Sequence, residues 1–272
     1  MIHTFGGLAL DRPRVMAIVN VTPDSFSDGG ERFDTTQAID DGLRFVSEGA
    51  DIVDVGGEST RPGAQATPVD EELGRVLRVV GELAKRNVVV SVDTRRAEVA
   101  RACLDAGASI VNDVSALRDD EAMLPLLARR RVPMVLMHRR GQAENKYDGP
   151  AYRDVVEDVR DFLLERGQAA EIAGVAHDNI AIDPGIGFGK TPEENLALIE
   201  GAGRLAATGY PVLIGSSRKG FIGRLTGVKE PGRRDPASVW LAVEAARLGA
   251  SILRVHDVAG TRQALAVWAA MR

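Results

Sequence analysis

Eight repeats of a short β-branched run followed by a helical pattern predict an α/β protein with a (β/α)8 TIM-barrel fold. The runs are almost continuously apolar, as in parallel strands that are covered on both faces. Nearly every run ends in a polar residue, which fits a barrel, because a barrel builds its site from the C-terminal ends of many strands. An open, doubly wound sheet would instead gather its functional groups at one switch point. The 272 residues contain no linker or low-complexity tract, so we expect a single domain, 1–272.

The expected strands come in a regular order along the chain. They are residues 14–20, 51–57, 87–94, 109–114, 132–138, 179–183, 210–216 and 251–256. Between them, apolar residues recur with the helical period, most clearly over 69–84, 155–163 and 239–246. Glycines stop several of these helices before the next strand, as at Gly49, Gly107 and Gly249. The alternation therefore continues from the first strand to the end of the chain.

Composition excludes several classes of protein. The net charge of −5 argues against a general nucleic-acid binder, and short basic clusters such as Arg129–Arg131 are expected to be solvated surface. The single cysteine, Cys103, lies on an apolar helical stripe and is expected to be a buried, inert thiol. No secretory signal or membrane-spanning run is present, so we expect a soluble, cytoplasmic protein without membrane contact.

The stretch "AIDPGIGFGKT", residues 181–191, ends like a nucleotide-binding P-loop. In that motif, however, the first glycine would fall at position 184, and Pro184 removes a backbone donor there. The glycines also follow G-x-G-x-G, which is not the dinucleotide fingerprint. Thr191 and Glu194 instead form a capping box that begins a helix, which leaves Asp183 as the residue for chemistry.

Polar residues at the strand ends divide into two groups. Three acids, Asp54, Asp93 and Asp183, follow strands two, three and six, and Asn112 follows strand four. Cations and donors follow strands seven and eight, namely Arg218, Lys219, Arg254 and His256. Carboxylate and amide groups with a lysine suit a polar heterocycle, and loops seven and eight of a barrel commonly bind phosphate. The acids could instead bind a metal, but no histidine or cysteine pattern for a transition metal accompanies them.

Two glycine-containing loops follow the first two strands. Residues 20–30, "NVTPDSFSDGG", resemble a lid with Phe26 as an aromatic contact. Residues 56–64, "GGESTRPGA", permit close backbone approach and offer Ser59, Thr60 and Arg61 to an anion.

Seven segments together resemble the dihydropteroate synthase family, in its order and spacing. They are "MAIVNVTPDSFSDGG", "VDVGGESTRPGA", "SVDT", "VNDVSAL", "IDPGIGFGKT", "GSSRKGFIG" and "RVHDV", and they extend from residue 16 to 258. The resemblance implies a transferase, a sulfonamide target, that joins p-aminobenzoate to 6-hydroxymethyl-7,8-dihydropterin pyrophosphate and releases pyrophosphate. Because pyrophosphate is a good leaving group and an electron-rich pterin can carry positive charge on its methylene, we expect a dissociative substitution.

The same resemblance implies roles for individual residues. The pterin pocket corresponds to Asp93, Asn112, Met137, Asp183, Phe188, Lys219 and Arg254, the last stacked on the ring. The pyrophosphate site corresponds to Asn20, Thr60, Arg254 and His256, with Mg²⁺ beside it and Asn20 as the metal ligand. Phe26, Arg61, Pro62 and Ser217 correspond to the p-aminobenzoate site. Asp28 is expected to stabilise positive charge, and the catalytic set implied is Asp28, Arg61, Lys219 and Arg254. The resemblance also implies a homodimer.

Two alternatives stay open. A methyltetrahydrofolate-dependent corrinoid methyltransferase would share the Asp/Asn pocket but would not need an arylamine loop or the Arg218–Lys219 pair. A non-catalytic pterin-binding paralogue would have lost parts of loops that are intact here. Residues 137–150 depart from the family pattern because Arg139 and Arg140 make the segment more basic, which leaves the role of this loop undetermined.

Overall fold

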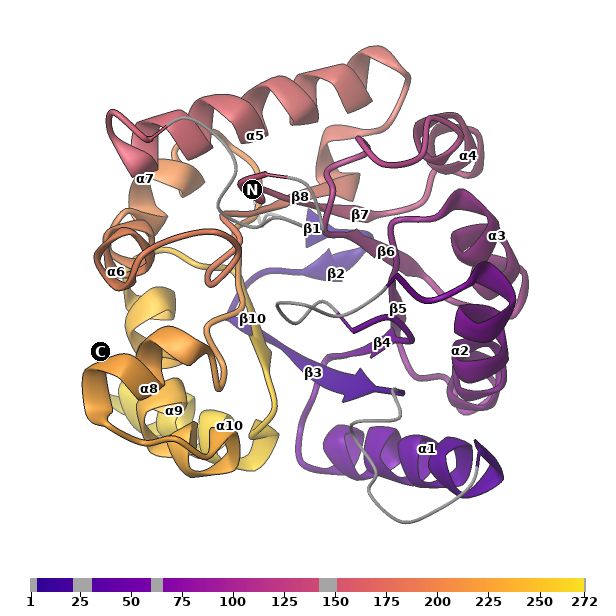
Figure 1. Cartoon of the computed structure of the whole chain (residues 1–272), viewed down its shortest axis with the longest axis horizontal. Coiled ribbons are helices and arrows are strands. Elements are labelled where there is room, and N and C mark those ends of the chain that lie inside the picture. The colour runs from indigo at the N-terminus through magenta and orange to yellow at the C-terminus, as the bar shows by residue number, and fades with distance from the viewer. Residues whose placement is uncertain (1–3, 22–30, 60–65, 142–150, 272) are drawn as a thin grey trace.

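Eight parallel strands form a closed ring at the centre of the molecule (Figure 1). The computed structural model describes residues 4–21, 31–59, 66–141 and 151–271, with the side chains of 31–34 left aside. Around the ring the strands are β3 (Arg14–Asn20), β4 (Ile52–Gly56), β5 (Val90–Asp93), β6 (Ile110–Asp113), β7 (Met134–Met137), β8 (Ile180–Asp183), β9 (Leu213–Ile214) and β10 (Ile252–Val255). Strand β10 pairs with β3, and a parallel bridge between Ile182 and Val212 joins β8 to β9. The predicted barrel is therefore confirmed, and the open sheet is excluded.

Helices surround the ring and connect its strands. They are α1 (Glu31–Ser47), α2 (Val69–Ala84), α3 (Ala97–Asp105), α4 (Met123–Arg130), α5 (Val155–Ile172), α6 (Pro192–Glu200), α7 (Ala202–Ala206), α8 (Gly220–Thr226), α9 (Asp235–Arg247) and α10 (Val258–Ala270), with the 3-10 turns η2 (His177–Asn179) and η3 (Pro231–Arg234). Helix α3 buries Cys103 completely, as predicted. Within the part of the chain that the structure describes, every helix is too short or too polar to span a bilayer.

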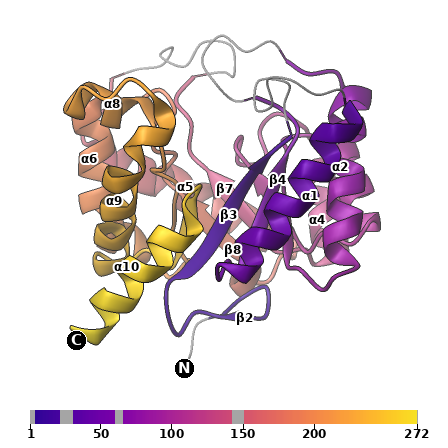
Figure 2. The same ribbon diagram turned by 90° about the horizontal axis from the view of Figure 1, so that it is seen from below.

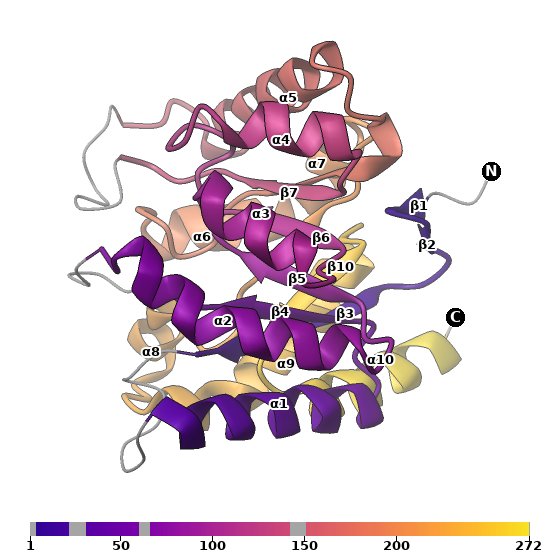
Figure 3. The same ribbon diagram turned by 90° about the vertical axis from the view of Figure 1, so that its right-hand side faces the viewer.

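A small hairpin, β1 (Thr4–Phe5) with β2 (Leu8–Ala9), lies at the end of the barrel where the strands begin (Figures 2 and 3). Its Phe5 is completely buried and packs against inward-facing residues of the ring. Those residues are Met16, Ile52, Ile110, Val135, Ala181, Leu213 and Ile252. Together with Phe5 they form an apolar floor that closes this end of the barrel.

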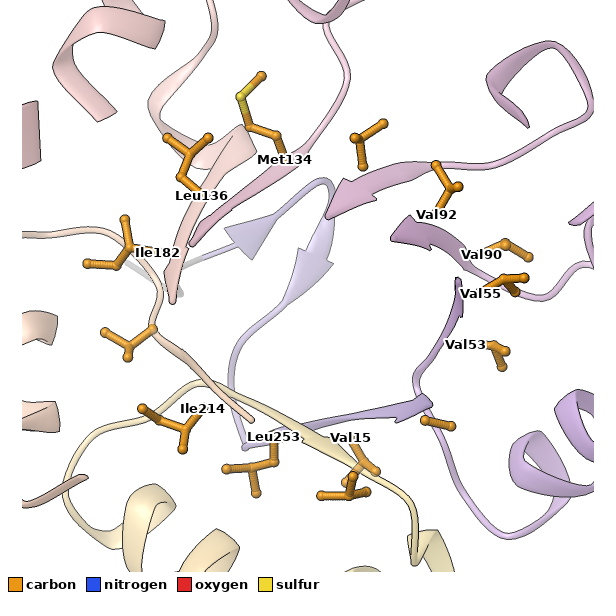
Figure 4. Close-up of a cluster of buried hydrophobic side chains, with 14 of the residues drawn as sticks. Val15, Val53, Val55, Val90, Val92, Met134, Leu136, Ile182, Ile214 and Leu253 are labelled. Carbon is orange, nitrogen blue, oxygen red and sulfur yellow. The ribbon is translucent and has the colours of Figure 1, made fainter. Parts of the chain in front are cut away.

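The outward side chains of the strands form a second, larger apolar cluster. Figure 4 shows Val15, Val53, Val55, Val90, Val92, Met134, Leu136, Ile182, Ile214 and Leu253 directed away from the centre of the ring. The helices pack against them, so the outer face is apolar along the whole length of each strand. This face explains the almost continuous apolar runs of the sequence.

Above the floor, the barrel interior becomes polar. Successive inward-facing residues of a strand are two positions apart. The next inward-facing residue after Ile52 is therefore Asp54, and the next after Ala181 is Asp183. By the same alternation Asn112 follows Ile110 and Arg254 follows Ile252. The fold thereby brings the polar strand ends of the sequence together at one end of the barrel.

Candidate active site

Arg254 connects two carboxylates inside the barrel mouth. Its Nε donates to Asp54 Oδ2 at 2.7 Å, and its Nη2 donates to Asp93 Oδ2 at 2.7 Å. Burial, with the nearby Asp54 and Glu72 charges, raises the pKa of Asp93 to about 7 against the attraction of Arg254 and Lys219. Asp54 and Asp93 are thus the anionic partners of the buried Arg254.

Asn112 is joined to the same network. Its Nδ2 donates to Asp54 Oδ2 at 3.0 Å, and both side chains are buried. Asp54 was predicted as one of the strand-end acids, but no individual role was predicted for it. The signal was available, because Asp54 is two residues after the buried Ile52 and must face the interior.

Asp183 ends β8 and fixes the glycine-rich turn that follows. Its Oδ1 accepts from the Gly185 backbone N–H at 2.7 Å. Gly185 has a φ of +69°, and a Cβ there would lie 1.8 Å from the His138 carbonyl oxygen, so only glycine fits. Burial raises the pKa of Asp183, while the Gly185 N–H and the Lys219 charge oppose the shift. The turn therefore sets the direction of the carboxylate.

Phe188 and Lys219 meet beside this turn. The Lys219 Nζ lies 4.2 Å from the centroid of the Phe188 ring, which is a cation–π contact. A Cβ at Gly187 would approach the Lys219 side chain to 3.0 Å, so the turn and the lysine pack closely. Met137, at the end of β7, is buried and lies beside Asp183 in the strand register. The structure therefore brings together Phe188 with Lys219, and Met137 with Asp183, all of them residues predicted for the pterin pocket.

His256 and Ser217 lie together after β10 and β9. The Ser217 Oγ is 2.9 Å from His256 Nδ1, and the His256 backbone N–H donates to the same oxygen at 3.2 Å. The structure consequently brings one residue expected at the pyrophosphate into contact with one expected at p-aminobenzoate.

Lys190 of the P-loop-like ending is a structural cation rather than a phosphate ligand. It is only 2% exposed, and its Nζ donates to the carbonyl oxygens of His138 at 3.3 Å, Gly185 at 3.0 Å and Phe188 at 3.3 Å. Burial lowers the pKa of Lys190 to about 7. The capping box is confirmed, since Thr191 N–H donates to Glu194 and Glu194 N–H donates back to Thr191 Oγ1.

Replacing Lys190 with methionine is expected to lower the free energy of unfolding by about 1–3 kcal/mol, because buried carbonyls lose their donor. Urea denaturation measures the change. Lys85→Met serves as the control, because the Lys85 side chain, directly after α2, is 73% exposed and pairs with Glu82 at the surface. Equal effects of the two substitutions would contradict the structural role of the buried ammonium group.

A chain of ion pairs crosses the rim of the barrel and includes one arginine whose role the sequence left open. Glu58 accepts from Arg95 Nε at 2.9 Å, and Arg95 Nη1 donates to Asp119 at 3.0 Å. Asp119 in turn pairs with Arg139. The neighbouring Arg140 lies over the Tyr152 ring, 5.0 Å from its centroid. Arg139 therefore ties the loop after β7 to the loops after β4, β5 and β6.

Five predicted site residues lie outside the residues that the structure describes, namely Phe26, Asp28, Thr60, Arg61 and Pro62. Their assigned roles stay predictions. Asn20 is described; it ends β3 opposite Gly56 of β4 and is partly exposed.

A resident metal ion would need suitable ligands in the candidate site. In the described ranges, no group of three or more His, Cys, Asp or Glu side chains is arranged to hold one. Mg²⁺ needs fewer protein ligands, because it commonly retains waters and binds substrate phosphates with one or two protein oxygens. The amide oxygen of Asn20, at the mouth of the barrel, fits that mode.

Comparisons with known proteins agree with this geometry. Residues 16–256 match the family model described as pterin binding enzyme. The dihydropteroate synthase of Mycobacterium leprae is 49% identical over 266 residues, which cover 96% of this chain and 94% of that protein.

Two solved structures of Xanthomonas albilineans dihydropteroate synthase are similar along almost their whole length. The one with 4-aminobenzoic acid has a TM-score of 0.92 and 51% identity and covers 99% of this chain and 97% of its own. The one in complex with 7,8-dihydropteroate has a TM-score of 0.88 and 49% identity, with 97% and 95% covered. The chain belongs to the pterin binding enzyme family and, within it, to the dihydropteroate synthases, which are transferases of folate biosynthesis.

Proposed function

We propose that this chain condenses 6-hydroxymethyl-7,8-dihydropterin pyrophosphate with p-aminobenzoate at the barrel mouth, by dissociative substitution at the pterin methylene. The observation that carries the proposal is the convergence of Asp93, Asn112, Asp183 and Lys219 from separate strands and loops into one polar interior layer. Relatives described with 4-aminobenzoic acid and with 7,8-dihydropteroate support the same two substrates.

The pterin ring is proposed to lie among the acids of this layer. Asp183 would accept paired N–H bonds from the heterocycle, since an ionised carboxylate offers two acceptor oxygens. Lys219 would meet the ring carbonyl, and its cation–π contact places it beside the apolar wall made by Phe188. Met137 would complete that wall, and Arg254 would stack on the ring.

The pyrophosphate is proposed to lie at the opposite side of the mouth. Arg254 and His256 would neutralise its developing charge, aided by Asn20 and Thr60. When bound there with Asn20, Mg²⁺ would supply further charge neutralisation to the leaving group. Closure of the site would exclude water, which competes with the amine as a nucleophile.

In the reaction, the bond between the pterin methylene carbon and the pyrophosphate oxygen breaks, and the oxygen keeps the electron pair. The arylamine lone pair then forms the carbon–nitrogen bond, and the nitrogen loses a proton. Asp28 is proposed to stabilise the positive charge between these events. Phe26, Arg61, Pro62 and Ser217 would hold p-aminobenzoate, whose amine needs no dedicated base.

The test is synthesis of dihydropteroate by the purified protein from the pterin pyrophosphate, p-aminobenzoate and Mg²⁺. Mass spectrometry should detect product, a chelator should suppress it, and added Mg²⁺ should restore it. A parallel incubation with methyltetrahydrofolate and a corrinoid acceptor tests the methyltransferase alternative. Absence of dihydropteroate at high enzyme concentration would refute the synthase, and pterin binding without turnover would favour the non-catalytic paralogue.

A homodimer through α9 and α10 is also proposed. These helices pack together, and Trp240 on α9 and Val267 on α10 are 64% and 63% exposed. Large apolar side chains exposed on adjacent helices favour burial against another protein surface. The cytoplasmic location stays a prediction of the sequence.

Trp240→Glu is therefore expected to convert a dimer into a monomer, which light scattering after size-exclusion chromatography measures. Ile172→Glu is the control, because Ile172 is also a large exposed apolar residue, at 88%, but lies on α5. A parent protein that is already monomeric would overturn the dimer, and dissociation by both substitutions would remove the assignment to α9 and α10.

A further inference from the structure

We infer that Asp54 is a positioning residue for the pterin site: it fixes which atom of Asn112 faces the substrate and anchors Arg254 beside Asp93. Asp54 has no role in the reaction as proposed above. The inference rests on that proposed function, because the substrate it concerns is the pterin.

The first part follows from donor and acceptor chemistry. Asp54 Oδ2 accepts from Asn112 Nδ2 at 3.0 Å. An ionised carboxylate cannot donate, so the NH₂ group of Asn112 must be the end that faces Asp54. The carbonyl oxygen of Asn112 is then the end left for a ligand. Asp54 thereby makes Asn112 an acceptor for an N–H group, where an unconstrained asparagine could present either end.

The second part follows from the way Arg254 divides its bonds. Its Nε donates to Asp54 and its Nη2 donates to Asp93, each at 2.7 Å. Asp93 must turn an oxygen towards the heterocycle when the pterin binds. The bond through Nε keeps Arg254 in place during that exchange and lets the Nη groups move towards the ring and the pyrophosphate. Asp54 is thus the fixed partner of Arg254, and Asp93 is the exchangeable one.

The bonding of Asp54 differs from that of a carboxylate with a purely structural role. Its side chain is 0% exposed, yet among the described residues its Oδ1 has no hydrogen-bond partner. Asp113, a buried acid at the end of β6, uses both oxygens, accepting from Ser115 N–H at 2.7 Å and Leu117 N–H at 2.8 Å. Leaving a buried oxygen without a partner costs stability. Within the described part of the chain, the side-chain hydrogen bonds of Asp54 go to Asn112 and Arg254, two residues of the proposed pterin site.

Asp54 also influences the charge state of Asp93. The groups that act on Asp93 are the Asp54 and Glu72 carboxylates, which raise its pKa in addition to its burial, and Arg254 and Lys219, which lower it. Removing the charge of Asp54 therefore shifts the titration of Asp93 to lower pH. A substitution that only weakened the fold would leave that titration where it was.

The experiment compares Asp54→Ala, Asp54→Asn and the control Asp113→Asn in the full chain. Titration calorimetry with 6-hydroxymethylpterin measures pterin affinity as a function of pH, steady-state kinetics measure KM for p-aminobenzoate, and urea denaturation measures stability. We expect Asp54→Ala to weaken pterin binding roughly 100-fold. Asp54→Asn should weaken it roughly tenfold or less, because asparagine keeps the shape of the side chain and one acceptor oxygen. KM for p-aminobenzoate should change less than about twofold in both variants, and the pH midpoint of pterin binding should fall in Asp54→Asn.

Asp113→Asn should lose stability while keeping the parental pterin affinity and pH midpoint. If Asp54→Ala binds the pterin as the parent does, or if the losses of affinity follow the losses of stability in all three variants, the inference is overturned. An unmoved pH midpoint in Asp54→Asn would equally contradict it. A parent protein that fails to bind the pterin would instead refute the proposed function, so the two failures are distinguishable.

Discussion

Asp183→Ala is expected to abolish measurable pterin binding, whereas Arg61→Ala should leave it nearly unchanged. Each hydrogen bond to a charged group contributes about 1.5–3 kcal/mol, so loss of two parallel bonds from the ring predicts roughly a 10²- to 10⁴-fold loss of affinity. The substitution also removes the acceptor that orders the turn at Gly185. Titration calorimetry with 6-hydroxymethylpterin measures the effect directly, without turnover.

The control for the turn is Asp183→Asn, whose amide oxygen can still accept from Gly185. This variant should unfold at the same urea concentration as the parent, although it lacks the negative charge that is proposed to bind the pterin N–H groups. Arg61→Ala should mainly raise KM for p-aminobenzoate. Equal losses of pterin affinity in the Asp183 and Arg61 variants would contradict the division of the site into pterin and p-aminobenzoate parts.

Arg254→Leu is expected to have the second-largest effect, on stability as well as on turnover. It leaves Asp54 and Asp93 buried without their shared cation. Breaking a buried ion pair by removing one partner costs about 3–5 kcal/mol of unfolding free energy. Product formation should fall by at least roughly a thousandfold, because the charge that stabilises the leaving group is lost with it. Urea denaturation and the product assay measure the two effects.

The stability loss in Arg254→Leu should depend on pH with a defined sign. Without the arginine, which lowers the pKa of Asp93, that pKa rises further in the folded protein, above its value in the unfolded chain. The folded state then binds more protons than the unfolded state, so the unfolding free energy decreases as pH rises. The deficit relative to the parent should therefore be larger at about pH 8 than at about pH 5.

Arg262→Leu is the matched control for Arg254→Leu. Arg262 also pairs with an aspartate, Asp51, at the opposite end of the barrel, but Asp51 keeps Arg12 and Arg14 as partners. The control should lose less stability and keep product formation. A deficit in Arg254→Leu that grows towards low pH, or one no larger than in the control, would contradict the role of Arg254 as the cation shared by two buried acids.

Local patterns were sufficient to predict most of the framework. The run at 14–20 is β3 with the expected bounds, and the other expected strands contain the observed ones with one or more extra residues at their ends. The helical stripe at 69–84 coincides with α2. Such features depend on neighbours within a few residues in the chain, so they are visible in the sequence. The ends of strands depend on partners in other strands and were overestimated, most of all at 210–216, where β9 comprises only Leu213–Ile214.

For the candidate site, the sequence predicted a set of residues but not the bonds that join them. Asp93, Asn112, Asp183, Lys219 and Arg254 were all placed in the pterin pocket from the residues and the family resemblance. The bonds of Asp54 to Asn112 and Arg254 were not predicted, because they cross between strands that are as much as 200 positions apart in the chain. Lys190 and Arg139 likewise acquire their roles only through carbonyl and carboxylate groups of other loops.

The sequence by itself determined the barrel, the capping box at Thr191 and the choice of residues at the strand ends, since each depends on short-range periodicity, backbone conformation or side-chain chemistry. Only the tertiary structure decided which of those residues form hydrogen bonds and ion pairs with one another. The closed ring places Asp54, Asp93 and Arg254 within hydrogen-bonding distance and removes them from water. In that setting the pKa of Asp93 rises, and the buried Lys190 holds the carbonyl groups of neighbouring loops. The physical reason is that the strength of an electrostatic interaction depends on burial and separation, and not on the order of residues along the chain.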